Sequence, residues 1–203
     1  MLRTFSLLAI SAGFLEEWLA AIVATPGLTA IRDLDEARSM LLDDSLRGVE
    51  IVRRYGGPVV DVGSGGGIPG IPLAVSLPTR RVTLLDSNGR KCAFLERWAP
   101  RNVVVVQGRA EEHETDAYGV VVAKALAPPP VAVEWCLPLV RVGGAAVLWV
   151  GPSLDLDRVA RVVPRLGGKV AGLEKGLLVL EKLEPTPPGF PRRTGVARKR
   201  PLA

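Results

Sequence analysis

The chain has 203 residues, 48% hydrophobic and 23% charged, which excludes an intrinsically disordered chain and allows one domain of ordinary size. Its 26 Lys and Arg residues exceed its 21 Asp and Glu residues, and the net charge of +5 indicates a polyanionic partner if the basic residues cluster. Two cysteines without a C-x-x-C spacing and a single histidine exclude a disulfide scaffold, a zinc ribbon and a histidine-rich metal site, so no metal is expected.

The first element in chain order is an apolar stretch from Phe5 to Leu15, which imitates the core of a signal peptide. Two glutamates follow it directly, where a signal peptide carries small neutral residues. Apolar residues then recur at the spacing of one helix face, at Leu15, Trp18, Leu19 and Ile22. We therefore predict an amphipathic helix and a cytoplasmic protein, with a signal peptide as the alternative.

The rest of the chain alternates short helices and short apolar strands. Helices are predicted from Asp33 or Asp35 to Arg47 and over residues 71–77, 88–98, 131–137 and 155–166. Strands are predicted over residues 59–62, 81–85, 103–106, 118–122, 145–150, 169–173 and 177–180, the last two as a hairpin. This alternation predicts an α/β fold, a doubly wound and mostly parallel sheet with helices on both faces.

The composition divides the chain into three parts. Residues 1–55 form a helical extension that is expected to pack on the core, and residues 56–184 form the sheet domain. Residues 185–203 are rich in proline and basic residues and are predicted to be an irregular arm, not a packed element.

A glycine-rich loop, Asp61-Val-Gly-Ser-Gly-Gly-Gly-Ile-Pro-Gly70, follows the first strand and allows a ligand to lie against the main chain. Its Gly65-x-Gly67-x-x-Gly70 spacing matches the dinucleotide fingerprint, so NAD is one candidate ligand. Asp61 favours S-adenosylmethionine instead, because a carboxylate repels the NAD diphosphate and attracts the cofactor's ammonium group. Asp86, at the end of the second strand, suits the ribose hydroxyls of either ligand. The pattern is that of class I methyltransferases.

The residues after the fourth strand restrict the methyl acceptor. Enzymes that methylate exocyclic amines commonly carry Asn/Asp-Pro-Pro-aromatic there, whereas this chain has Ala127-Pro-Pro-Pro130. Carbon-5 pyrimidine methylation needs a thiolate, and Cys92 and Cys136 fall in helices where we expect them to be buried. An acceptor that is already nucleophilic, such as guanine N7, requires alignment and charge placement without a general base. Trp149 is expected to pack in the core, with stacking on the target base as the alternative.

Several motifs resemble one family, and they extend from about Leu15 to the last residues. They are Leu28-Thr-Ala-Ile-Arg-Asp33, Asp44-Ser-Leu46, the glycine loop up to Leu73, Leu84-Leu-Asp-Ser-Asn-Gly-Arg-Lys91, Phe94-Leu95, Gly108-Arg-Ala-Glu-Glu112 and Pro191–Leu202. The chain resembles the ribosomal RNA small subunit methyltransferase G family, also called glucose-inhibited division protein B. The resemblance implies a class I S-adenosylmethionine-dependent methyltransferase with an N-terminal helical extension. It also implies methyl transfer to N7 of guanine 527, in the 530 loop of 16S rRNA, as naked RNA or in the assembling small subunit.

The loop pattern and the resemblance together assign cofactor binding to Asp61, Gly63, Gly65, Ile68, Asp86, Ala110, Glu111 and Lys124. Within this set Gly63 and Ile68 are expected to line the methionine end, Asp86 to hold the ribose, and Ala110 and Glu111 to flank the adenine. Lys124 replaces an Arg of the family, which keeps the charge and loses the forked donors. The family's His and Lys correspond to Leu41 and Val150 here.

The basic residues do cluster. Residues 191–203 hold five of the cations and no acid, which leaves 21 basic and 21 acidic residues in the remainder of the chain. RNA binding is therefore assigned to Arg109, Lys124, Arg192, Arg193, Arg198, Lys199 and Arg200. We expect deletion of the arm to weaken RNA binding and to leave the affinity for S-adenosylmethionine intact.

Three other functions stay open at this point. The departures at Leu41, Lys124 and Val150 allow a non-catalytic relative that binds RNA and S-adenosylmethionine. The fold also suits a small-molecule methyltransferase, and the glycine fingerprint an NAD-dependent oxidoreductase.

Overall fold

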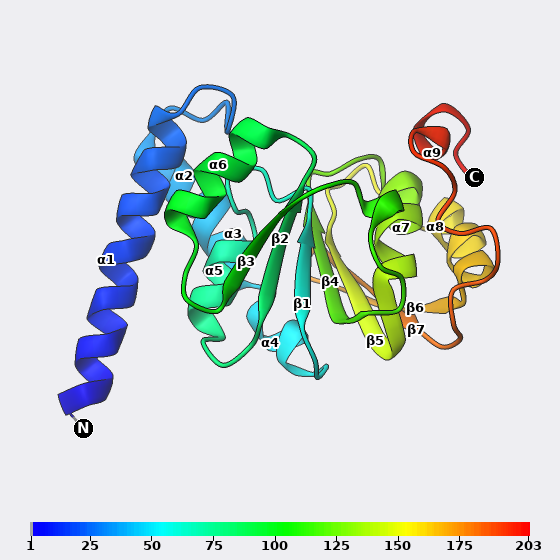
Figure 1. Cartoon of the computed structure of the whole chain (residues 1–203), viewed down its shortest axis with the longest axis horizontal. Helices are drawn as coiled ribbons and strands as arrows, with labels where there is room; N and C mark the ends of the chain where they lie inside the picture. The colour runs from blue at the N-terminus through cyan, green and yellow to red at the C-terminus, as the bar shows by residue number, and fades with distance from the viewer. Residues whose placement is uncertain (1) are drawn as a thin grey trace.

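The computed structural model describes the backbone of residues 2–203 and the side chains of residues 13–203. Its middle layer is a seven-stranded sheet in the order β3-β2-β1-β4-β5-β7-β6 (Figure 1). The strands are β1 (Val59–Val62), β2 (Val82–Asp86), β3 (Val103–Gln107), β4 (Tyr118–Lys124), β5 (Val140–Trp149), β6 (Gly168–Glu174) and β7 (Leu177–Lys182). Neighbouring strands from β3 to β5 are parallel, and β7 runs antiparallel to both of its neighbours. The predicted mostly parallel sheet and its terminal hairpin are confirmed.

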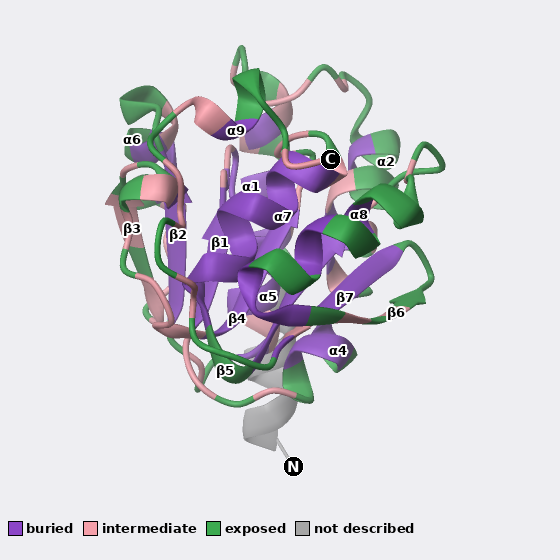
Figure 2. Cartoon of the chain, turned by 90° about the vertical axis from the view of Figure 1, so that its right-hand side faces the viewer, coloured by how far each residue is buried: buried purple, intermediate pink, exposed green. Residues whose placement is uncertain are grey.

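Helices cover both faces of the sheet, because successive strand residues point to opposite sides. Val59, Leu84 and Val122 belong to the core beneath α1 (Leu2–Ala24), α5 (Gly70–Ser76) and α6 (Gly89–Trp98). Val60 and Val121 belong to a second core, beneath α7 (Pro129–Cys136), α8 (Leu156–Val162) and α9 (Val196–Lys199). On that side α7 is buried, whereas α8 and α9 keep exposed faces (Figure 2). The doubly wound α/β fold is confirmed.

The N-terminal helix α1 confirms the predicted helical stripe. Leu15, Trp18, Leu19 and Ile22 are each at most 8% exposed and pack into the core of the first face. The side chains of the preceding apolar stretch up to residue 12 lie outside the described residues. In the part of the chain that is described, no helix combines the length and hydrophobicity needed to cross a membrane.

The predicted helix from Asp33 to Arg47 is broken into short pieces. Asp33 caps α2 (Leu34–Ala37) through a bond from the backbone N of Glu36, as predicted. A π-helical turn, η1 (Arg38–Asp43), then leads into α3 (Asp44–Leu46), and α4 (Val49–Arg53) follows. The wider turn changes which side chains face inward. No sequence signal marked this turn.

The remaining helices and strands have the type that the sequence predicted, with ends shifted by a few residues. The strand β5 starts at Val140, five residues early, because Val140 already pairs with Tyr118 of β4, ahead of a register irregularity near Gly143, whose φ is 80°. Beyond α8 the chain tightens into the 3-10 turn η4 (Val163–Leu166), since Pro164 has no N–H for a continued α-helix. The 3-10 turn η2 (Ala110–Glu112) lies between β3 and β4, and η3 (Leu137–Leu139) joins α7 to β5.

The interpretation of residues 185–203 as an unpacked tail is wrong. The helix α9 lies in this segment, Ala197 is 2% exposed, and Phe190, Leu202 and Ala203 pack on the core beneath α7. The polar backbone at its end is also bound, because Arg165 donates to the carbonyl oxygen of Leu202. Apolar residues spaced between the prolines and arginines bury enough surface to fix the segment.

Candidate functional site

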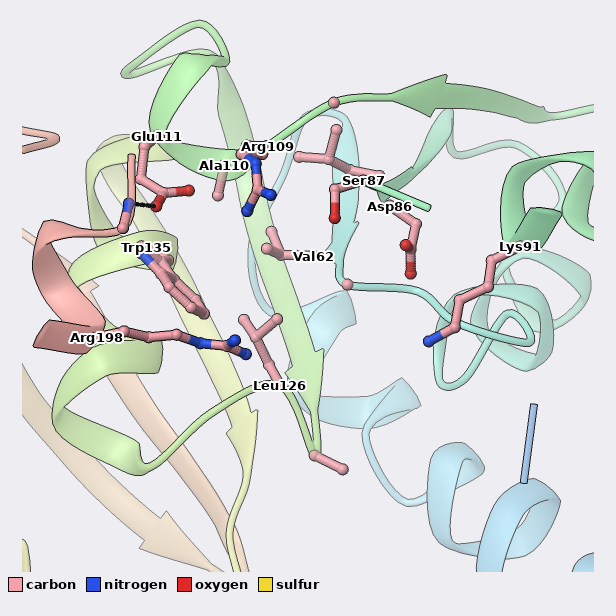
Figure 3. Close-up of a pocket in the computed structure, with 15 residues that line it drawn as sticks. Val62, Asp86, Ser87, Lys91, Arg109, Ala110, Glu111, Leu126, Trp135 and Arg198 are labelled. Atoms are coloured by element: carbon pink, nitrogen blue, oxygen red, sulfur yellow. Dashed lines mark hydrogen bonds between the residues drawn. The ribbon is translucent and has the colours of Figure 1, made fainter. Parts of the chain in front are cut away.

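A cavity of about 350 Å³ opens at the carboxyl ends of β1, β2, β3 and β4 (Figure 3). This is the edge at which open α/β sheets bind ligands, and the volume falls in the range of small-molecule sites. We call it the cofactor cavity. Four residues that the sequence assigned to cofactor binding line it together, namely Gly63, Asp86, Ala110 and Glu111.

The floor of the cofactor cavity is the start of the glycine loop. The backbone N–H groups of Gly63 and Ser64 donate to the carbonyl oxygen of Leu85, 2.8 and 3.1 Å away, which ties the loop to the end of β2. Gly63 has a left-handed φ of 71°, and a Cβ there would overlap the side chain of Leu126. Glycine is therefore favoured at this position, and the bare backbone is available to a ligand.

The N-terminal extension holds the other side of the loop. The indole N–H of Trp18 donates to the carbonyl oxygen of Gly66 over 2.9 Å, and a Cβ on Gly66 would press on Ile22. Both contacts come from buried residues of α1. The extension thus acts as a support for the ligand loop.

Asp61 is fully buried and does not line the cofactor cavity, which corrects its predicted contact with the cofactor. Its Oδ2 accepts a 3.0 Å hydrogen bond from the backbone N of Gly70, the first residue of α5, so the carboxyl group fixes the shape of the loop. Burial raises the pKa of Asp61 to about 7, against the opposing effect of the bonds from Gly70 and Ser64. Its Oδ1 is buried without a partner among the described residues.

Asp86 has the geometry expected of a ribose acceptor. Its Oδ2 accepts from the backbone N of Gly65 over 2.9 Å and its Oδ1 from that of Asn88 over 2.8 Å, so the carboxylate is held rigidly at the cavity wall. An ionised carboxylate accepts about four hydrogen bonds, which leaves one free position on each oxygen. Two adjacent hydroxyl groups, as on a ribose, match this arrangement.

The end of β3 supplies the far wall, where Arg109, Ala110 and Glu111 all line the cavity. Ala110 is 6% exposed, whereas the side chain of Arg109 is exposed at the rim. Oε1 of Glu111 accepts a 3.2 Å hydrogen bond from the backbone N of Gly195 (Figure 3). The C-terminal segment, residues 191–203, therefore reaches the cofactor cavity.

Three predicted cofactor ligands lie elsewhere. Gly65 donates its backbone N–H to Asp86 and does not line the cavity itself, and Ile68 packs on the core of the first face. Lys124 lies in a neighbouring cavity of about 740 Å³, which we call the second cavity, and there its ammonium group is 2.6 Å from a carboxylate oxygen of Asp44. Ala125, the residue that follows Lys124, lines both cavities with a left-handed φ of 52°.

Sequence reasoning missed several residues of the cofactor cavity, among them Leu126, Trp135, Gly195 and Arg198. Arg198 stood among the basic residues assigned to RNA, and Trp135 is one of the apolar residues of α7. Arg198 comes to the cavity because the C-terminal segment folds back onto α7, where its guanidinium lies over Trp135. Pairing of this kind leaves no local sequence signal.

Arg192 has a different partner from the predicted RNA phosphate. Its guanidinium donates to both carboxylate oxygens of Glu134, a residue of α7 whose side chain is 1% exposed. The bond to Glu134 raises the pKa of Arg192. Arg192 is thus an anchor between the C-terminal segment and the core.

The described residues contain no group of three or more His, Cys, Asp and Glu side chains arranged to hold a metal ion. Cys92 and Cys136 are both buried, as predicted. Burial raises the pKa of the Cys136 thiol strongly, which disfavours the thiolate that a nucleophile requires.

Comparison with known proteins places the chain in one family. A family model described as rRNA small subunit methyltransferase G matches residues 13–158. A ribosomal RNA small subunit methyltransferase G of Synechococcus elongatus is 37% identical over 198 residues, covering 86% of this chain and 82% of the relative. A protein of the same description from Roseiflexus castenholzii is also 37% identical, over 196 residues, covering 86% and 83%.

Solved structures agree on the fold. The 16S rRNA N2 G1207 methyltransferase of T. thermophilus, solved with AdoMet and guanosine, is 21% identical with a TM-score of 0.53, covering 72% of this chain and 40% of its own. The pyocyanin biosynthetic protein PhzM is 15% identical with a TM-score of 0.58, covering 73% and 56%. These likenesses show the fold of class I S-adenosylmethionine-dependent methyltransferases.

Proposed function

The chain belongs to the rRNA small subunit methyltransferase G family and is an S-adenosylmethionine-dependent methyltransferase, and we propose that it methylates N7 of guanine 527 in the 530 loop of 16S rRNA. The proposed substrate is naked 16S rRNA or the assembling small subunit, in the cytoplasm. Bound S-adenosylmethionine supplies an electrophilic methyl group. Guanine N7 carries an in-plane lone pair and no proton, so the protein needs only to align the two.

The observation that carries this proposal is the meeting of two cavities at Ala125. In the first, Gly63, Asp86 and Ala110 fit the methionine end, ribose and adenine of the cofactor. The second shares Ala125 with the first and is lined by Trp149 and Lys124. A methyl group at this shared wall faces whatever base the second cavity holds.

The second cavity combines an aromatic ring, a hydrogen-bond donor and the side chains of Asp43 and Asp44. The indole N–H of Trp149 donates to the carbonyl oxygen of Asp44 over 2.9 Å, which fixes a half-buried ring suitable for stacking. Lys124, paired with Asp44, offers only hydrogen-bond donors. A donor matches O6 of guanine, and a contact there leaves the N7 lone pair free for the methyl group.

The proposed RNA contacts are the exposed cations beside this edge, Arg109, Arg193, Lys199 and Arg200. The last three lie in the C-terminal segment. Each phosphate contact to single-stranded RNA contributes roughly 0.7 to the slope of log affinity against log salt. Replacing these three by alanine is expected to reduce the magnitude of the slope by about 2, measured by filter binding between 50 and 200 mM salt, the range over which such slopes develop.

Transfer from labelled S-adenosylmethionine to rRNA that lacks its native modifications tests the reaction. We expect label in RNA and borohydride–aniline cleavage at a single guanine, the signature of a methylated N7. Asp86→Asn is expected to weaken cofactor binding about 10- to 150-fold, because it replaces charge-assisted hydrogen bonds to the ribose. Glu96→Gln, on the exposed side of α6, is the matched control.

The small-molecule methyltransferase and the non-catalytic relative each have a distinct outcome in this assay. Label in a small molecule and never in RNA would contradict the proposal and favour a small-molecule methyltransferase. Binding of RNA and cofactor without product would identify a non-catalytic relative. Label at a position that resists borohydride–aniline cleavage would keep the enzyme class and refute the N7 assignment.

A further inference from the structure

The C-terminal segment, residues 191–203, lies beyond the stretch that the family model matches, yet it forms part of the cofactor cavity wall. Three contacts hold it there. Arg192 pairs with the buried Glu134, Thr194 Oγ1 donates to Glu112 over 2.7 Å, and Gly195 N donates to Glu111 over 3.2 Å. The helix α9 is thereby fixed next to the end of β3.

Arg198 points from α9 into the cavity. Its guanidinium carbon lies 5.4 Å from the centroid of the Trp135 ring, and the side chain extends toward Leu126 (Figure 3). The ion pairs found within residues 13–203 do not include Arg198. An unpaired cation on an aromatic ring therefore faces the ligand space.

The position of the ribose determines what Arg198 meets. Asp86 ends β2 and Ala110 follows β3, the adjacent strand, so a purine attached to a ribose at Asp86 extends toward Ala110. Trp135 and Arg198 lie on this same side of the cavity, and Gly195 is bonded there to Glu111 (Figure 3). A planar guanidinium stacks on aromatic faces, and adenine offers such a face.

We propose that the C-terminal segment completes the cofactor site and that Arg198, seated on Trp135, packs its guanidinium against the adenine ring of S-adenosylmethionine. The proposal rests on the placement of the cofactor in this cavity. It reverses the expectation that removal of the C-terminal segment leaves cofactor affinity intact. The segment serves cofactor binding through Arg198 and RNA through its outward cations.

Calorimetric titration of the full-length protein with S-adenosylhomocysteine and with adenosine tests this. Arg198→Ala is expected to weaken both ligands by the same factor, about 3- to 30-fold, because the lost contact is to the purine. Arg198→Lys keeps the charge and loses the planar face, so its loss is expected to be smaller. Arg200→Ala is the matched control, since this exposed side chain of the same segment does not line the cavity. The substitution also keeps the backbone carbonyl oxygen of residue 200, which accepts a hydrogen bond from Arg192.

Two comparisons separate the possible failures. If Asp86→Asn weakens S-adenosylhomocysteine and Arg198→Ala changes neither ligand by as much as twofold, the role of Arg198 is refuted and the cofactor placement stands. If Asp86→Asn has no effect, the placement itself is wrong and the proposal falls with it. The melting temperature of ligand-free Arg198→Ala is expected to match that of the wild type. A lowered melting temperature, together with full recovery of ligand affinity in Arg198→Lys, would show a structural role and overturn the proposal.

Discussion

Replacing Arg192 by alanine measures how firmly the C-terminal segment is held. The guanidinium contacts both oxygens of Glu134, whose side chain is 1% exposed, whereas that of Arg192 is 23% exposed. Arg192→Ala leaves a buried carboxylate without its cation, a change that costs about 3–5 kcal/mol. Glu134→Gln leaves a guanidinium that water reaches, so the expected loss is the smaller value of about 1–3 kcal/mol for a charged hydrogen bond.

Urea unfolding followed by circular dichroism measures both free energies of unfolding. We expect Arg192→Ala to be the more destabilising change, and the double variant to lose less than the sum of the two single losses. Arg193→Ala, an exposed neighbour, is the control and is expected to stay within about 0.5 kcal/mol of the wild type. Equal losses below about 1 kcal/mol in both single variants would refute the buried-anchor reasoning.

Three further predictions concern the loop and the sheet. Because the pKa of Asp61 in the folded protein is raised to about 7, the folded protein keeps a proton that the unfolded chain releases near pH 4. The free energy of unfolding is therefore expected to fall by up to about 4 kcal/mol as the pH rises between these two values. Asp61→Asn is expected to flatten this pH dependence, measured by urea unfolding. Gly63→Ala is expected to weaken S-adenosylhomocysteine about tenfold or more by calorimetry, through its positive φ and the overlap with Leu126. Gly119→Ala places a methyl group on the backbone carbonyl oxygen of Gly56 and is expected to lower the free energy of unfolding by more than about 3 kcal/mol, measured by thermal unfolding. Gly172→Ala, which has open space in β6, is the control and is expected to lower it by about 1 kcal/mol or less.

The fold was predictable where the signal is local. The strand that contains Asp61, the glycine loop and the cap at Asn88 each depend on a few adjacent residues, and the structure has them where the sequence placed them. The position of Asp86 followed as well, because the carboxyl ends of parallel strands meet at one edge. The role of Asp61 did not follow, since a position in the sequence does not show which way a carboxylate turns.

The missed features depend on contacts between distant parts of the chain. The π-helical turn η1 lies on the second cavity, where Asp44 meets Lys124 80 positions later. The fixed C-terminal segment depends on Arg192 reaching Glu134, 58 positions earlier. One clue was present: Glu134 is the single charged residue of α7, among Val131, Ala132, Val133 and Trp135. A lone acid on a buried helix face predicts a cationic partner, although it does not identify that partner.

The five cations of the C-terminal segment give the chain its net charge, but the charge alone does not determine what each cation does. Arg192 is neutralised by a buried acid, and Arg198 faces the cofactor cavity with Trp135 at its side. Arg193, Lys199 and Arg200 are exposed like Arg198 but do not line that cavity, so they are the ones available to phosphate. The segment therefore places the contacts proposed for the cofactor and for RNA on one short stretch, which the Arg192–Glu134 ion pair anchors together with the bonds of Thr194 and Gly195. Because both depend on that anchor, loosening it is expected to weaken both ligands together, whereas changes at the exposed cations affect RNA alone.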